Sequence, residues 1–124
     1  MSDPMNAGLR GGINLFNQGR FFEAHETWEM LYQRAEINDK AFLEGLIQLA
    51  AACRLIEDFG EIKGPVKLIY QALIRLENYQ PIYLDVKVAD LAVAMEGWAK
   101  EIEASGLRGQ KPVPTIAVRR FGFF

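Results

Sequence analysis

Apolar residues recur along most of the chain at the spacing of an α-helix. Leu9, Ile13 and Phe16 lie four and three positions apart, which places their side chains on one helical face. Gly19 follows at a position suited to end that helix. A second helix is predicted from about Phe21 to Ala35, with a continuous apolar arc on one side.

Three further helices are predicted after this pair. The segment from about Lys40 to Phe59 is apolar nearly all round, which is typical of a central, buried helix. After a turn at Gly60 and residues 64–65, a fourth helix is predicted to about Tyr79. The fifth carries a regular apolar stripe made of Leu84, Val88, Leu91, Met95, Trp98 and Ile102.

No segment alternates apolar and polar residues over the length of a strand, so no sheet is predicted. Pro112 and Pro114 block a helix near the end of the sequence, and residues 110–124 are therefore predicted to form an extended tail. Short connections favour antiparallel neighbours. The pattern predicts an all-α fold, a multihelical bundle of about five helices. It consists of two antiparallel helical hairpins plus a C-terminal helix and the extended tail, in a single domain over residues 1–124.

Composition narrows the classes of function. The 124-residue chain is 50% hydrophobic and 24% charged, as globular proteins are, and its net charge of −2 argues against a surface that binds nucleic acid. The single cysteine, Cys53, has no partner for an internal disulfide and is expected in the core. No stretch approaches the roughly 20 apolar residues of a membrane span. We expect a cytoplasmic protein that binds neither membrane nor nucleic acid.

Two motifs carry a family resemblance. Residues 16–26 read F-N-Q-G-R-F-F-E-A-H-E, and residues 42–50 read F-L-E-G-L-I-Q-L-A. In this order they resemble the family known as domain of unknown function 309, in which an F-N-x-G-x-[FY]-F-E-A-H-E segment precedes an F-[LF]-Q-G-L-I-Q-x-A segment. The resemblance covers a core region of roughly residues 9–76. It implies a small all-helical domain, and it implies no activity.

The chain departs from the family pattern at several positions. Glu44 stands where glutamine is usual, Tyr32 where tryptophan is usual, and Trp28 where an aliphatic residue is more frequent. Members of the family often carry a histidine late in the third helix, where this chain has Leu55 and Ile56. If that histidine is a ligand in relatives, this chain does not share their site in full.

The candidate site is centred on His25, the only histidine in the chain. His25 and Glu29 are four residues apart, so both project from one face of the second helix. Glu44 and Gln48 have the same spacing on the third helix. If the two helices pack antiparallel through these faces, the four polar side chains converge in apolar surroundings and must satisfy one another.

Three interpretations of this cluster stay open. In the first, the cluster is a structural network that fixes the register of the helix pair. In the second, His25, Glu29 and Glu44 are metal ligands with Gln48 behind them, as in the carboxylate–histidine sites of helical bundles. In the third, the cluster lines a small-ligand or catalytic pocket, with His25 as a general base that Glu29 orients. The sequence specifies no cofactor.

The favoured hypothesis is a binding or interaction module with a buried His/Glu/Gln cluster. Its expected binding residues are His25, Glu26, Trp28, Glu29, Glu44 and Gln48. The alternative is a hydrolase-like enzyme, metal-assisted or His-based, with His25 and Glu29 as catalytic candidates. A protein partner or a second copy of the chain is the expected interaction. The segment 119–124, R-R-F-G-F-F, is expected to pack on the bundle or on a second subunit, or else to bind a partner, an acidic groove or nucleic acid.

Overall fold

Five helices form the frame of the computed structural model, which describes residues 3–107 and 111–119. The helices are α1 (Asp3–Asn17), α2 (Phe21–Arg34), α3 (Ile37–Phe59), α4 (Lys63–Leu76) and α5 (Val88–Ser105). A short 3-10 helix (Glu77–Tyr79) and two strands, β1 (Ile82–Tyr83) and β2 (Val86–Lys87), lie between α4 and α5. The all-α bundle predicted from the sequence is confirmed.

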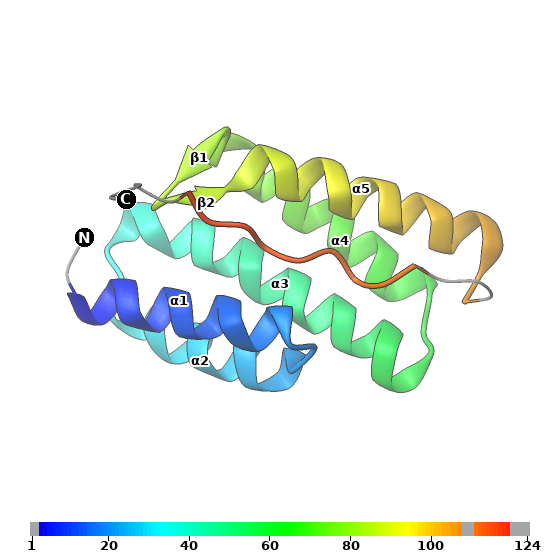
Figure 1. Ribbon diagram of the computed structural model, residues 1–124, viewed down its shortest axis with the longest axis horizontal. Coiled ribbons are helices and arrows are strands. Elements are labelled where there is room, and N and C mark those ends of the chain that lie inside the picture. Colours follow the sequence, from blue (N-terminus) through cyan, green and yellow to red (C-terminus); the bar gives the residue numbers. More distant parts are fainter. Residues whose placement is uncertain (1–2, 108–110, 120–124) are drawn as a thin grey trace, which may run out of the picture.

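Helix α3 occupies the middle of the bundle and packs against α2 on one side and α4 on the other (Figure 1). The pairs α1–α2 and α3–α4 are the two predicted hairpins, and α5 packs on α4. All five helices contribute to one apolar cluster, whose α3 members include Phe42, Leu46 and Leu49. No helix in the described part of the chain is both long and apolar enough to cross a membrane.

Glycine ends α1 and α3, as the sequence predicts. Gly19 follows α1 with φ of 80° and Gly60 follows α3 with φ of 66°, in the left-handed region that a residue without Cβ adopts at little cost. The Gly60 N–H donates to the Ile56 carbonyl and the Glu61 N–H to the Leu55 carbonyl, both at 3.1 Å. These bonds satisfy carbonyls at the end of α3 and turn the chain into α4.

Two other glycines let helices approach closely. A Cβ on Gly12 of α1 would lie 2.0 Å from the indole nitrogen of Trp28, and a Cβ on Gly45 of α3 would lie 2.7 Å from Leu76 of α4. Both distances are far below van der Waals contact. The α1–α2 and α3–α4 contacts therefore depend on the absence of a side chain at Gly12 and Gly45.

Several helix boundaries and one element differ from the sequence prediction, and α4, for example, ends at Leu76 and not at about Tyr79. Helix α3 begins at Ile37, because the Asp39 and Lys40 N–H groups both bond to the Glu36 carbonyl. Residues 82–87 form an antiparallel hairpin in place of the first turn of α5, and Leu84 and Asp85 at its turn have φ of 48° and 65°. Each strand has two residues, too few to show alternation in a sequence.

The described tail is extended and lies between α1 and α5 in Figure 1. Its Ile116 is 3% exposed and exchanges two hydrogen bonds with the Asn17 side chain, at 2.9 and 2.7 Å. The Lys87 N–H of β2 donates to the Ala117 carbonyl, so the tail also pairs with the hairpin. The extended tail is confirmed for residues 111–119, whereas residues 120–124 lie outside the described part.

Candidate functional site

Two of the predicted binding residues on α2, Trp28 and Glu26, differ in their exposure to solvent. Trp28 is 0% exposed, and its indole N–H donates to the Leu9 carbonyl of α1 at 3.3 Å. Trp28 is therefore a core residue in this structure, and its prediction as a binding residue gains no support from its position. Glu26, in contrast, is exposed to solvent.

His25 lies at the wall of a cavity of about 170 Å³ between α2 and α3. Phe21 and Phe22 line the cavity from α2, and Ala50, Ala51, Arg54 and Leu55 line it from α3. The imidazole is half-buried and makes no hydrogen bond or ion pair with any residue in the described part of the chain. Its ring nitrogens therefore make no hydrogen bond within the described part of the fold.

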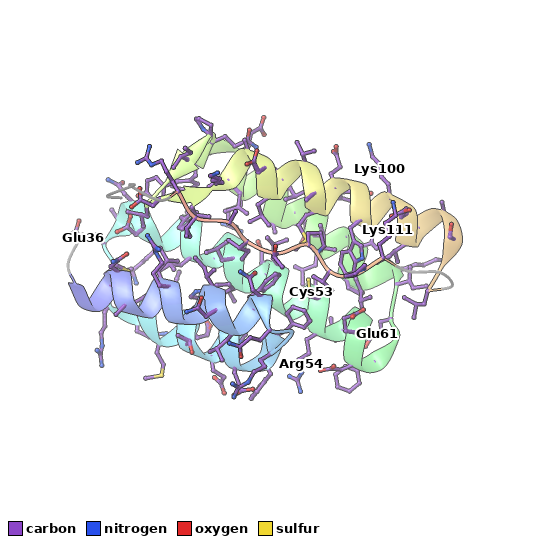
Figure 2. The ribbon with its side chains drawn as sticks, in the orientation of Figure 1. Glu36, Cys53, Arg54, Glu61, Lys100 and Lys111 are labelled. Carbon is purple, nitrogen blue, oxygen red and sulfur yellow. The ribbon has the colours of Figure 1, made fainter. Side chains whose placement is uncertain are left out.

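Arg54 lines this cavity together with Phe22, and its guanidinium also contacts the ring of Phe59 outside the lining. Its guanidinium carbon is 4.4 Å from the centroid of Phe22 and 5.5 Å from that of Phe59. The Phe22 and Phe59 side chains are 48% and 60% exposed. Figure 2 shows Arg54 at the outer edge of the molecule, whereas Cys53, the residue before it, lies within the body of the bundle. We call Phe22, Arg54 and Phe59 the rim triad.

Arg54 forms one weak, solvent-exposed ion pair within the molecule. Its nearest acidic contact is Asp58, whose Oδ2 lies 3.8 Å from Arg54 Nε one turn further along α3. Side chains of both residues are at least 40% exposed, so water screens this pair and it contributes little. The guanidinium keeps donors available for an incoming acceptor.

Glu44 and Gln48 contact Arg75 of α4 and do not line the His25 cavity. The Arg75 Nε–H donates to Gln48 Oε1 at 3.2 Å, and Arg75 Nη1 lies 3.5 Å from Glu44 Oε2. Neither residue lines the cavity, and no polar or charged side chain in the described ranges is buried. The predicted buried His25–Glu29–Glu44–Gln48 cluster is therefore wrong. Burial of carboxylates carries a large desolvation cost, and both pairs stay at the solvent edge of their helices.

The proposed metal ligands are not assembled either. Within residues 3–107 and 111–119, no three His, Cys, Asp or Glu side chains come together in a group that could hold a metal ion. His25, Glu29 and Glu44 all lie in these ranges. Glu29 is half-buried on α2 and forms no hydrogen bond or ion pair with described residues, so it does not orient His25.

Cys53 is a core residue, as the sequence predicts. It is 0% exposed, and burial raises the pKa of its thiol well above the ordinary value, with a smaller contribution from the nearby charge of Glu57. A protonated, sealed thiol is a poor nucleophile. Cys53 therefore brings no reactivity to the His25 cavity.

The residues that sequence reasoning missed are Arg54, Phe59 and the small wall residues Ala50 and Ala51. A signal for Arg54 was present, since it is a single charge within the long apolar run of α3. Helical spacing places Arg54 on the same face of α3 as Ile47, two turns earlier, but it does not predict the contact with Phe22 of α2. That contact depends on how far α2 slides along α3, which the sequence pattern leaves open.

Fold and site together define a class of protein, a small bundle of helical hairpins with an apolar cavity between its second and third helices. The model of the family described as domain of unknown function (DUF309) matches residues 9–68, from α1 to the first turns of α4. Over this segment, the match confirms the resemblance drawn from the two motifs. Comparison with curated proteins gives no match.

Proposed function

We propose that the protein is a binding module whose site is the His25 cavity with the rim triad. The ligand is a segment of a protein partner that presents an apolar side chain next to a carboxylate. The observation that carries this proposal is the position of Arg54, an exposed cation between two exposed phenylalanines at the mouth of an apolar cavity.

The rim triad has the composition of a protein interface. Burial of an exposed phenylalanine ring by a partner is favourable. Arginine and aromatic residues are also enriched at protein interfaces. The guanidinium stacked on an aromatic ring is held in a defined direction at low entropic cost. An acceptor carboxylate then meets a preoriented fork of donors.

The cavity matches the size of one side chain. A cavity of about 150 Å³ holds a benzene ring in a protein interior, so about 170 Å³ accommodates a leucine-sized or phenylalanine-sized group. Phe21, Ala50, Ala51 and Leu55 offer it an apolar surface. Two lining residues have polar side chains, Arg54 and His25. In this proposal His25 forms a hydrogen bond with the backbone of the ligand.

The lining favours binding over catalysis. Among the lining residues there is one imidazole and one guanidinium but no hydroxyl, thiol or carboxylate. A His-based hydrolase needs a nucleophile or an oriented water near the base. The alternative of a hydrolase centred on His25 therefore gains no support from the lining of this cavity.

The test uses N-acetyl-leucine as the smallest probe with both features, followed by backbone amide chemical shifts in NMR. We expect shift changes at residues 21–25 and 50–55. N-acetyl-leucinamide, which lacks the carboxylate, is expected to bind more weakly. Arg54→Ala should remove the difference between the two probes, and Arg34→Ala, on the exposed end of α2, should leave it unchanged.

Two outcomes would overturn the proposal. One is the absence of shift changes in both segments with either probe. The other is equal binding of both probes by the wild-type protein, which would remove the carboxylate from the recognition. A hydrolytic activity that His25→Ala abolishes without loss of fold would favour the enzyme instead.

A further inference from the structure

A second open groove lies between α4 and α5, away from the His25 cavity between α2 and α3. It is a groove of about 410 Å³ with an apolar floor that includes Leu73 and Ala92. Ile74 and Val93 stand at its sides and are 69% and 75% exposed. Two β-branched side chains open to solvent on facing helices are unusual on a surface that nothing covers.

The groove is also acidic. Glu77 and Glu96 are its charged lining residues, and no basic side chain is among them. Lys100 lies 3.8 Å from Glu96, but both groups are more than half exposed and Lys100 does not line the groove. At one side the Tyr70 hydroxyl donates to Glu103 at 2.5 Å, which together with burial and the charges of Glu103 and Glu96 raises the pKa of Tyr70 to about 12.

The chain itself carries a sequence of complementary chemistry. Arg120 and the phenylalanines of residues 121–124 combine positive charge with large apolar rings. The preceding residue, Arg119, is held at the hairpin, where its N–H donates to the Asp85 carbonyl at 2.6 Å and its guanidinium to the Asp85 carboxylate at 2.9 Å. Five residues beyond this anchor reach at most about 17 Å.

The anchor and the groove of the same molecule are formed by different elements. The tail pairs with β2, β2 pairs with β1, and Gln80 of the groove precedes β1. The described tail also faces α1 and α5 (Figure 1), while the groove lies between α5 and α4. Because the tail next to the anchor is held against α1 and α5, the groove of a second molecule is the site that we consider.

We infer that residues 120–124 of one copy bind the α4–α5 groove of a second copy. The phenylalanines supply the apolar surface that covers Ile74 and Val93, and Arg120 supplies the charge that Glu77 and Glu96 attract. A reciprocal exchange closes the pair about a two-fold axis and uses both grooves and both segments. The partner at this surface is therefore the chain itself.

The test compares solution mass by sedimentation over a range of protein concentrations. The full chain should form a dimer. Removal of residues 120–124 and the substitution Val93→Glu should each raise the dissociation constant about tenfold or more, because the first removes the ligand and the second places a like charge beside Glu96. Ile37→Glu, at an 83% exposed position on α3, is the matched control and should leave the mass unchanged.

Mixing the two defective proteins separates exchange between copies from binding within one copy. The truncated protein keeps its groove and the Val93→Glu protein keeps its segment, so a mixture should form a heterodimer through one exchange. Circular dichroism of both variants verifies the fold. A monomeric full chain at every concentration would overturn the inference, as would a dimer that both changes leave intact or the failure of the mixture to associate.

Discussion

Trp28 and His25 stand three residues apart on α2, yet they belong to two different regions of the molecule. Trp28 is 0% exposed, donates to the Leu9 carbonyl and fits against Gly12. His25 is half-buried, lines a cavity and has no hydrogen-bond partner among described residues. One short motif thus supplies both a closed packing contact and an open site.

The difference shows what the polar atom of each ring does for the fold. The indole N–H is satisfied by a backbone carbonyl of α1, so the α1–α2 contact is complete without water or ligand. The imidazole remains at a solvent-connected wall, where its loss removes no internal hydrogen bond. We therefore expect mutations at the two positions to separate stability from binding.

The largest effect is expected for Trp28→Ala. Removal of a fully buried indole leaves a cavity in the core, and such changes cost about 3–5 kcal/mol of unfolding free energy. Urea unfolding followed by circular dichroism measures the loss. Met30→Ala, at a 65% exposed position on the same helix, is the control and should stay within about 0.5 kcal/mol. Equal losses at both positions would contradict the closed contact.

Gly12→Ala should destabilise the protein by about 1–3 kcal/mol, because the added methyl collides with the Trp28 ring. Gly11→Ala is the matched control, since a Cβ there has nothing within 4 Å. In a helix interior alanine is better than glycine by about 1 kcal/mol, so Gly11→Ala should raise the melting temperature. The opposite signs at adjacent glycines are the diagnostic result. Two changes of the same sign would refute this account.

Asn17→Ala should cost about 1–2 kcal/mol, because it removes both hydrogen bonds that hold Ile116 of the tail against α1. This prediction tests a second closed contact, the one between α1 and the tail, whose residues are far apart in the sequence. Limited proteolysis should cut the tail faster in this variant. Asn14→Ala, exposed one turn earlier, is the control, and equal cleavage of both variants would show that Asn17 does not anchor the tail.

His25→Ala should change the unfolding free energy least, by no more than about 0.5 kcal/mol. The imidazole has no internal hydrogen bond to lose, and alanine is a good helix former. The same variant should weaken binding of N-acetyl-leucine in the NMR titration. A loss of stability close to that of Trp28→Ala would show that His25 is a core residue. It would contradict the distinction between a packing residue at position 28 and a site residue at position 25.

Much of the fold followed from local patterns. The periodicity from Phe21 onward and the left-handed glycines at positions 19 and 60 identified the α1–α2 and α3–α4 hairpins, because helix faces and caps are properties of a few neighbouring residues. The β1–β2 hairpin was missed. Its turn places Leu84 and Asp85 at positive φ, and it is held by pairing with Val118 and Arg119, contacts that no short window contains.

The candidate site was found in part. His25 was identified because it is the only histidine and lies on the inner edge of α2. Glu44 and Gln48 were assigned to it from helical spacing alone, whereas the structure pairs them with Arg75 of α4. The face of α3 that carries them borders both neighbouring helices, and spacing does not say which neighbour supplies the partner.

By itself, the sequence determined the helices, their order, the buried faces and the family resemblance of residues 9–68, because each depends on periodicity or on a contiguous motif. Only the tertiary structure decided which side chains meet. It placed Arg54 between Phe22 and Phe59, brought Gly12 against Trp28 and fastened the tail to Asn17 and β2. These contacts depend on the axial offset and rotation of packed helices, which are set by the packing of many side chains at once.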